Sequence, residues 1–284
     1  STGREAKTIH RLLEVNVIKT DESYFMHNEQ NPLKVDAVIV DEVSMVDCAL
    51  MCNLLKALPR DCKLILVGDK DQLPSVGAGN VLGDILESKT IPYCMLTKIF
   101  RQGEKSLIIT NAHLINDGKM PLIDNTSTDF FFESKGDPES IKNTIVNLVT
   151  IRLPKFLKTD PREIQVLAPM KAGVCGIESL NRTLQEVINP PTPTKPQVEV
   201  GQTIFRLGDK VMQITNNYDL EWKKHGTYAD ESGQGVFNGD IGYITLIDPN
   251  NGEVNVEFED GRNCLYTRPD LLDLSLSYAI TFHK

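Results

Sequence analysis

Two adjacent carboxylates, Asp41 and Glu42, follow a mostly apolar run at residues 35–40. Such a run predicts a buried strand, and open parallel sheets bind their ligands at the carboxyl ends of the strands. In a nucleotide-hydrolysing site the first acid holds Mg²⁺, usually through water, and the second orients and deprotonates the attacking water. A solvated turn or a helix N-cap would explain the same pair without any chemistry. The pair therefore permits nucleotide hydrolysis but does not establish it.

A longer string on the next predicted strand narrows the choice. Residues 64–79 read Leu-Ile-Leu-Val-Gly-Asp-Lys-Asp-Gln-Leu-Pro-Ser-Val-Gly-Ala-Gly. The amide of Gln72 can donate a hydrogen bond to a γ-phosphate oxygen while it accepts one from the attacking water, so it can sense a bound triphosphate. Pro74 and the glycines after it give a loop that can pass closely beside a strand of polymer. A plain turn explains a Gly-Asp or Leu-Pro pair but hardly the whole string.

Short apolar runs alternate with helical patterns between residues 35 and 170, which is typical of a parallel sheet with helices on its faces. We expect strands at residues 35–40, 63–67, 93–96, 129–132 and 164–167. We expect helices at residues 46–57, 79–87, 107–116, 139–149 and 176–188. The proline-rich residues 189–196 cannot continue a helix and form a linker or an exposed loop. Beyond them, Asn-Gly and Asp-Gly turns and the alternation of Val254, Val256 and Phe258 predict short antiparallel strands with one buried face.

The charge of the chain is unevenly distributed. Thirty basic and thirty-nine acidic residues give a net charge of −9, which argues against binding nucleic acid by bulk positive charge. Residues 219–273 hold twelve acidic and four basic side chains, a net of −8, so the remaining residues carry about −1. A local groove for DNA outside this acidic segment therefore remains possible.

The six cysteines and the apolar residues exclude some classes of protein. The cysteines show no Cys-x-x-Cys pair or metal-ligand spacing, so we expect reduced thiols and no structural metal. No run of about 18 apolar residues and no basic-then-apolar leader occurs, so we expect a cytoplasmic protein with no membrane partner.

Three strings resemble consecutive motifs of the RecD-like DNA helicases, the exodeoxyribonuclease V alpha subunit family in the 5′→3′ branch of superfamily 1. They are Asp-Glu-Val-Ser-Met from residue 41, the string at 68–79, and Leu-Thr-Lys-Ile-Phe-Arg-Gln at 96–102. The resemblance implies that Asp41 binds Mg²⁺, that Glu42 is the general base, and that Gln72 and Arg101 contact the γ-phosphate of ATP. An always-charged, planar arginine suits the charge on a transferring phosphoryl group. An isolated arginine at a helix start would more simply form a surface salt bridge.

Further matches extend over nearly the whole chain, at residues 2–13, 166–173 with 180–181, 208–213, 216–218, 236–242 and 277–284. By this resemblance the following residues contact single-stranded DNA: Thr8, His10, Ser75, Val76, Lys171, Asn238, Thr281 and His283. The two histidines could equally be satisfied by backbone groups inside the core, and the lysine could be a solvated charge. Trp222 and the basic residues 223–225 could stack on a base, although a mobile exposed loop is the simpler explanation.

The resemblance implies an α/β fold with two incomplete RecA-like, P-loop-NTPase-type domains and a small SH3-like β-barrel inserted in the second. We expect the first motor domain at residues 1–160, the second at 161–212 and 274–284, and the acidic barrel at 213–273. Partners would be single-stranded DNA and duplex junctions, in DNA repair or recombination. Nuclease or helicase partner subunits could supply any nuclease activity.

No Gly-x-x-x-x-Gly-Lys-Ser/Thr string occurs in the sequence, although ATP-driven motors hold phosphates with such a loop. We therefore expect an internal fragment of a helicase that neither hydrolyses ATP nor unwinds DNA by itself. Two alternatives stay open. One is a non-catalytic module that binds DNA or, through its acidic barrel, a basic protein. The other is a relaxase-helicase of the TraI kind or a Dda-like helicase, which share several of these motifs.

Overall fold

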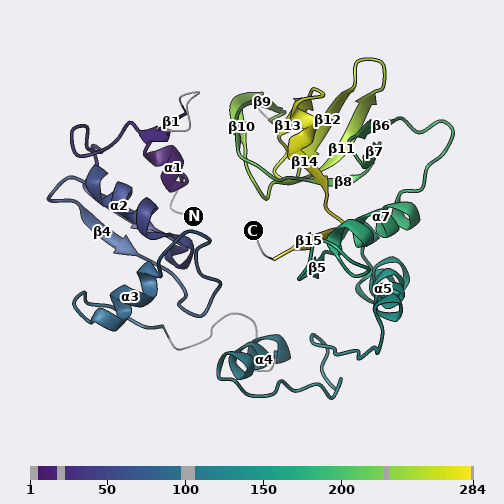
Figure 1. Cartoon of the computed structure of the whole chain (residues 1–284), viewed down its shortest axis with the longest axis horizontal. Coiled ribbons are helices and arrows are strands. Elements are labelled where there is room, and N and C mark those ends of the chain that lie inside the picture. The colour runs from purple at the N-terminus through teal and green to yellow at the C-terminus, as the bar shows by residue number, and fades with distance from the viewer. Residues whose placement is uncertain (1–5, 18–22, 97–105, 227–229, 283–284) are drawn as a thin grey trace. The chain divides into compact units, whose positions relative to one another are not determined.

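The computed structural model describes residues 6–17, 23–96, 106–226 and 230–282. The chain divides into two compact units, Ser1–Phe132 and Glu133–Lys284, and each has its own hydrophobic core (Figure 1).

In the first unit, two short strands form a parallel pair, β3 (Ala37–Val40) and β4 (Lys63–Leu66). Burial alternates along β3, as it must when successive side chains point to opposite faces of a sheet. Val38 and Val40 are buried, whereas Ile39 on the other face is 68% exposed.

Two helices cover the buried face of this pair, α2 (Cys48–Ala57) and α3 (Val81–Ser88). Met51, Leu54 and Ala57 recur every third residue along α2 and form its buried stripe. The helix ends at Ala57 because the next residue precedes Pro59, which disfavours helical backbone at the position before it. The predicted helices at residues 46–57 and 79–87 are thus confirmed within two residues.

The remaining elements of the first unit are short. They are α1 (Ile9–Leu12), the antiparallel pair β1 (Val15–Val17) and β2 (Ser23–Phe25), the 3₁₀ turn η1 (Val43–Met45) and α4 (Leu107–Asn116). Leu13 and Leu33 join the core of β3, α2 and α3. The predicted helix at 107–116 is confirmed at both ends.

Two predicted strands are wrong. Residues 93–96 form no strand, and Leu96 is 91% exposed. Residues 129–132 form no strand because side chains occupy their hydrogen bonds. Asn125 accepts from the Phe132 N–H at 2.7 Å and donates to the Phe132 carbonyl at 2.9 Å. The Asp129 carboxylate instead accepts from the Ser106 hydroxyl at 2.5 Å, at the start of α4. Short side chains that bond to nearby backbone compete with strand pairing in this way.

The second unit contains another parallel pair, β5 (Val166–Ala168) and β15 (Ala279–Thr281), beside α7 (Ile177–Ile188). Leu180 and Leu184 are fully buried on α7. A longer helical stretch precedes the pair, made of α5 (Pro138–Asn147), the π-helical turn η2 (Leu148–Arg152) and α6 (Leu153–Leu157), followed by the 3₁₀ turn η3 (Pro161–Glu163). The predicted helices at 139–149 and 176–188 are confirmed, and the strand predicted at 164–167 begins two residues later.

Between β5 and β15 the chain forms an antiparallel sheet in the order β10-β9-β13-β12-β11-β8-β14. These strands are β8 (Lys210–Gln213), β9 (Asn217–Lys224), β10 (Glu231–Val236), β11 (Ile241–Asp248), β12 (Glu253–Phe258), β13 (Asn263–Tyr266) and β14 (Leu274–Leu276). A separate hairpin precedes the sheet, made of β6 (Gln197–Val200) and β7 (Thr203–Arg206). The 3₁₀ turn η4 (Asp270–Asp273) precedes β14. The predicted alternation along β12 is confirmed, because Val254, Val256 and Phe258 are buried. Register shifts in β10 and β11 bend the sheet, as β-bulges do.

The predicted fold class is confirmed: parallel strand pairs with helices occur in both units, and a separate antiparallel sheet is inserted in the second. Among the described residues, no helix has the length and apolar character needed to cross a membrane. The predicted domain limits at residues 160, 212 and 273 stay predictions.

Candidate active site

The two candidate motifs of the first unit meet at one edge of the β3–β4 pair. Val67 N–H donates to the Val40 carbonyl at 2.8 Å, and Val43 N–H donates back to the Val67 carbonyl at 3.0 Å. Asp41 and Glu42 therefore lie beside the start of the Gly68 loop. A Cβ atom built on Gly68 would lie 3.1 Å from the Val43 nitrogen and 3.2 Å from the Ser44 nitrogen, so a side chain there would crowd the two backbones.

The acid pair has an unusual backbone conformation. Glu42 lies in the left-handed region, with φ 55° and ψ 41°, which costs a residue other than glycine roughly 1–2 kcal/mol. Its N–H donates to the Asp41 Oδ1 atom at 2.9 Å. Both side chains are exposed at the carboxyl edge of the sheet. This conformation turns the chain sharply after β3 and leaves both carboxylates accessible to solvent.

These residues suit a hydrated Mg²⁺ ion. Asp41 Oδ1 is engaged with backbone, and its second oxygen is available to water bound to a hard cation, which prefers oxygen ligands. The Ser44 hydroxyl is buried at the same edge and has no hydrogen-bond partner among the described residues. Orphaned buried hydroxyls are rare in proteins, so this one fits a site whose polar environment a bound group completes. No cluster of three or more His, Cys, Asp or Glu side chains capable of direct metal binding occurs in the part of the chain that the structure describes.

Gln72 lies in an exposed turn that Asp69 stabilises. Asp69 accepts from Asp71 N–H through its carboxylate at 3.0 Å and from Gln72 N–H through its carbonyl at 3.3 Å. The Gln72 side chain is exposed. A hydrogen bond from the Lys70 ammonium lowers the pKa of Asp71, and the Asn116 amide on α4 adds to that effect. Asp71 is thus fixed by its neighbours, while the Gln72 amide remains accessible.

Residues 74–79 fold back onto the first turn of α2. Cys48 N–H donates to the Ala78 carbonyl at 3.1 Å, and the Ser75 hydroxyl donates to the Gly77 and Gly79 carbonyls at 2.9 and 3.1 Å. A Cβ atom on Gly77 would collide with the carboxylate of Asp47, which caps α2 through Leu50 N–H at 2.7 Å. The loop therefore requires these glycines for close approach to α2. It presents Val76, which is 79% exposed.

Among the other predicted DNA contacts of the first unit, Thr8 caps α1, accepting from Arg11 N–H at 3.2 Å. His10 is exposed on α1, with its ring centroid 5.9 Å from that of Phe25, so it is no core histidine. Arg101 and His283 lie outside the described residues.

In the second unit the β5–β15 pair gathers two predicted contacts at one edge. Thr281 is the last residue of β15 and is in register with Ala168, the last residue of β5. Lys171 follows β5 in an exposed turn, where its carbonyl accepts from Glu178 N–H at 3.2 Å. Asn238 lies elsewhere, in the turn before β11, where its N–H donates to the Asn216 side chain at 3.0 Å. The structure thus brings Lys171 and Thr281 to one sheet edge and leaves Asn238 on the antiparallel sheet.

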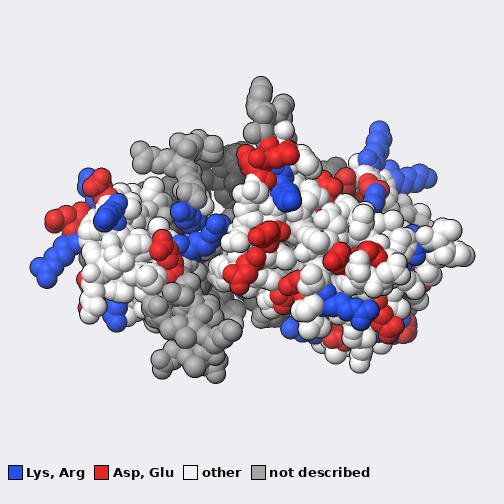
Figure 2. Space-filling model, turned by 90° about the horizontal axis from the view of Figure 1, so that it is seen from above, with Lys and Arg blue, Asp and Glu red and all other residues white. Residues whose placement is uncertain are grey.

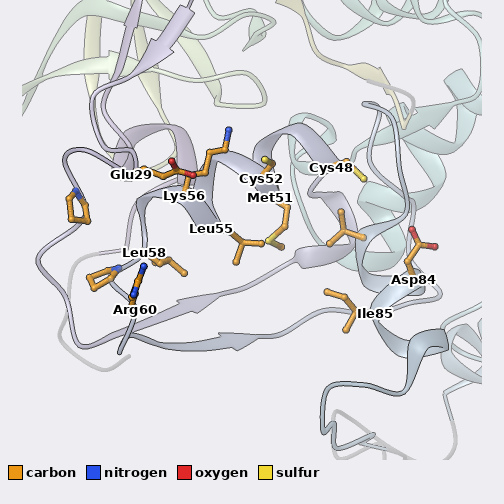
Figure 3. Close-up of a pocket in the computed structure, with 13 residues that line it drawn as sticks. Glu29, Cys48, Met51, Cys52, Leu55, Lys56, Leu58, Arg60, Asp84 and Ile85 are labelled. Carbon is orange, nitrogen blue, oxygen red and sulfur yellow. The ribbon is translucent and has the colours of Figure 1, made fainter.

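The described surface carries mixed charge. On the face drawn in Figure 2, acidic and basic side chains are interspersed. A groove of about 930 Å³ lies against α2 and is lined by residues that include Met51, Cys52 and Leu55 (Figure 3). It contains none of the predicted site residues. The candidate chemistry is therefore at an open sheet edge rather than in this groove.

Asn181 in the second unit matched the family pattern at residues 180–181, but the sequence assigned no role to it. Asn181, buried on α7, donates to the Ala279 carbonyl and accepts from the Ala279 N–H, both at 2.8 Å. It thereby binds the backbone of β15. The signal was an asparagine beside Leu180 and Leu184 on the buried stripe of the helix, where an unpaired amide is costly.

Comparison with known proteins gives two family matches. Residues 180–258 match the family described as ATP-dependent RecD-like DNA helicase SH3 domain, and residues 1–78 match the family described as AAA domain.

Curated relatives match the chain from end to end. The chain is 33% identical over 284 residues to the ATP-dependent RecD2 DNA helicase of Deinococcus radiodurans, covering 100% of this chain and 34% of that protein. It is 28% identical to the RecBCD enzyme subunit RecD of Buchnera aphidicola subsp. Acyrthosiphon pisum, covering 98% of this chain and 51% of that protein. The chain thus spans between a third and a half of these relatives.

Among solved structures, one titled as showing DNA unwinding at forked dsDNA by two coordinating Pif1 helicases is similar at a TM-score of 0.47 and 17% identity, over 97% of this chain and 68% of that one.

Proposed function

Since the chain belongs to the family of RecD-like DNA helicases, we propose that the intact protein is an ATP-driven motor that moves 5′→3′ along single-stranded DNA and unwinds duplexes. The observation that carries this proposal is the shared edge of β3 and β4. There the Asp41–Glu42 pair and the Gly68 loop are joined by the hydrogen bonds of Val67 and Val43. The Deinococcus radiodurans relative, which matches the whole chain, supports the ATP and DNA specificity because it is named an ATP-dependent DNA helicase.

The proposed mechanism assigns roles to three residues of this edge and to Arg101, which lies outside the described residues. Bound ATP with Mg²⁺ supplies the phosphoryl group and the cation that neutralises its charge. Asp41 would hold the hydrated cation through its second carboxylate oxygen, and Glu42 would take the proton from the attacking water. Gln72 orients that water and contacts the γ-phosphate, and Arg101 stabilises charge on the phosphoryl oxygens.

The DNA contacts form the second half of the proposal. In the first unit, Thr8, His10, Ser75 and Val76 would lie along the strand, with Val76 at the exposed tip of its loop. The Ser75 hydroxyl already donates to Gly77 and Gly79 carbonyls, so it would meet DNA as an acceptor. In the second unit, the proposed contacts are Lys171, Asn238, Thr281 and His283.

The organisation of the protein is also a proposal. Residues 1–160 would belong to the first motor domain, 161–212 and 274–284 to the second, and 213–273 to the inserted barrel. The 284 residues contain no Gly-x-x-x-x-Gly-Lys-Ser/Thr loop, so we propose that they do not hydrolyse ATP without further protein. Single-stranded DNA and duplex junctions would be the substrates. Nuclease or helicase subunits in the cytoplasm would be partners, and the relatives named as RecBCD enzyme subunits support an assembly of several subunits.

The test is Glu42→Gln in the full-length protein, with Glu87→Gln as the matched control, since Glu87 is exposed on α3 away from the acid pair. We expect Glu42→Gln to lower kcat for DNA-stimulated ATP hydrolysis by about 100-fold or more, because it removes the general base. The KM for ATP and the affinity for single-stranded DNA should stay near wild type, and the control should retain full activity. Equal activity of both variants would overturn the assignment of Glu42.

A further inference from the structure

Asp209 is a fully buried carboxylate that the proposed chemistry does not use. It lies between β7 and β8 and accepts hydrogen bonds from the Gln185 amide at 2.6 Å, the Asn189 amide at 2.7 Å, the Arg206 N–H at 2.7 Å and the Tyr278 hydroxyl at 2.9 Å. These donors come from α7 and its end, from β7, and from the junction between β14 and β15. One carboxylate therefore joins the helix, the start of the antiparallel sheet and the strand that returns from it.

No described cation neutralises this carboxylate. The nearby Arg206 guanidinium instead bonds to Glu186 at 2.5 Å and to the Asn189 carbonyl at 3.2 Å. Burial raises the pKa of Asp209, and the hydrogen bonds of its neighbours oppose that rise. A buried carboxylate satisfied only by neutral donors is costly to disturb, because losing one donor leaves part of a desolvated charge unpaired. The arrangement of its donors is therefore tightly specified.

Tyr278 connects this carboxylate to the backbone of the junction. Tyr278 is only 2% exposed, and the backbones of the residues on either side also make hydrogen bonds. Ser277 N–H donates to the Lys210 carbonyl on β8 at 2.9 Å, and Ala279 makes its two hydrogen bonds with Asn181 on α7. The junction thus has one attachment to the antiparallel sheet, one to α7 and, through Tyr278, one to Asp209. Thr281, at the end of β15, follows directly.

We propose that Asp209 and Tyr278 are positioning residues whose hydrogen bond fixes β15 to both α7 and the antiparallel sheet, so that Thr281 is presented to DNA in one register. The strand and the antiparallel sheet then turn as one body rather than hinging at Ser277. The DNA part of this inference rests on the proposed function, whereas the coupling of strand and sheet does not.

The test compares Tyr278→Phe with Tyr266→Phe in the full-length protein. Both tyrosines are fully or almost fully buried and each hydroxyl makes one side-chain hydrogen bond, Tyr278 to Asp209 and Tyr266 to Gln213 at 2.7 Å. Tyr266 belongs to β13 inside the antiparallel sheet. Phenylalanine keeps the ring in both cases, so each variant removes one bond and little packing.

Hydrogen exchange of single amides gives the first readout, without nucleotide or DNA. In Tyr278→Phe we expect protection of the Ala279 and Thr281 amides to fall about tenfold to hundredfold, since the lost bond is to a charged group, while the Val254 and Val256 amides on β12 change less. Tyr266→Phe should lower the protection of Val254 and Val256 more than that of Ala279 and Thr281. Equal loss of protection on β15 and β12 in Tyr278→Phe would overturn the proposal, because a purely structural bond would destabilise the whole unit.

Binding of single-stranded DNA, followed by fluorescence anisotropy without ATP, gives the second readout. Tyr278→Phe should weaken binding roughly twofold to thirtyfold and Tyr266→Phe should leave it unchanged, as expected for a residue that acts through Thr281. Unchanged binding in Tyr278→Phe would refute the positioning role. If the wild-type protein itself fails to bind single-stranded DNA, the proposed function fails, and the exchange experiment still decides whether strand and sheet are coupled.

Discussion

Substituting Gly79 by alanine should detach the loop at residues 74–79 from α2, because the added methyl group has no room. Gly79 has φ +106°, where an alanine costs roughly 1–3 kcal/mol of backbone strain. Its Cβ would also overlap the Cys48 sulfur, and overpacking of this kind costs about 1–3 kcal/mol. The first cost comes from the backbone angle of residue 79 and the second from its contact with the Cys48 side chain, so removing the sulfur separates them.

The loss of stability has an upper bound, because the loop can leave its place without unfolding the unit. Detachment breaks the bond from the Cys48 N–H to the Ala78 carbonyl, and loss of the loop's conformation breaks the one Ser75 hydroxyl hydrogen that the Gly77 and Gly79 carbonyls share, at about 1 kcal/mol net for each donor. We therefore expect Gly79→Ala to lower the free energy of unfolding by roughly 2 kcal/mol, near the cost of detaching and unfolding the loop. Alkylation of Cys48 should become faster, because the loop no longer packs against its sulfur.

Gly118→Ala is the matched control in the same unit. Gly118 also has positive φ, +71°, but a Cβ there would meet no atom within 4 Å, so only a backbone cost of about 1 kcal/mol should appear. Urea unfolding of both variants separates the backbone part from the contact part. Adding Cys48→Ala to Gly79→Ala should restore the contact part. If the two glycine variants lose equal stability, or if Cys48→Ala restores nothing, the steric argument is refuted.

Two further predictions concern the second unit. Asn181→Ala should lower its free energy of unfolding by about 2–4 kcal/mol in urea, because the Ala279 N–H and carbonyl lose their buried partner; a loss below 1 kcal/mol would mean that water replaces the amide. Burial raises the pKa of Cys264 to about 12 from its ordinary 9.0, so this thiol should resist a disulfide reagent at pH 8.5 while the exposed Cys52 reacts. The raised pKa favours the protonated thiol in the folded state, so the contribution of Cys264 to stability is present below pH 9 and is lost as the pH rises toward 12. In Cys264→Ala the free energy of unfolding should therefore fall less steeply with pH above 9 than in the wild type.

The parts of the fold that the sequence predicted correctly are those in which periodicity and burial agree. On α2 the stripe of Met51, Leu54 and Ala57 is the stripe that packs, and on β12 the alternating Val254 and Val256 are buried. The predicted strands at 93–96 and 129–132 failed for a different reason. Their residues are apolar enough for a strand, but no neighbouring strand supplies their hydrogen bonds, and Asn125 takes those of Phe132 instead. Pairing partners are a property of the tertiary structure, which a local pattern does not contain.

The candidate site shows the same division. The strand-then-acid pattern correctly predicted that Asp41 and Glu42 follow a strand beside the Gly68 loop, because parallel strands bring their carboxyl ends together. The left-handed backbone of Glu42 was not predictable, since glutamate has no preference for that region and the turn is imposed by the bond between Val43 and Val67. Asp209 lies in the matched string at residues 208–213, but its hydrogen bonds were not predictable because its partners, from Gln185 to Tyr278, are spread over much of the second unit.

The uneven charge of the chain constrains how it could hold a polyanion. The acidic excess of residues 219–273, twelve acidic against four basic side chains, disfavours phosphates near the antiparallel sheet, so Asn238 would contact DNA without help from charge. Three proposed DNA contacts lie outside the acidic segment, namely Val76, Lys171 and Thr281. They lie in loops or at strand ends near the carboxyl edges of the parallel pairs. Most of these side chains are uncharged, so binding them to DNA would release few counterions. They would therefore contribute little affinity, and their contribution would depend on where they lie along the DNA strand. In the proposed motor, weak contacts of this kind would let the DNA be released and bound again at each step. The rigid attachment of β15 through Tyr278 and Asn181 would then supply the positional accuracy that charge does not.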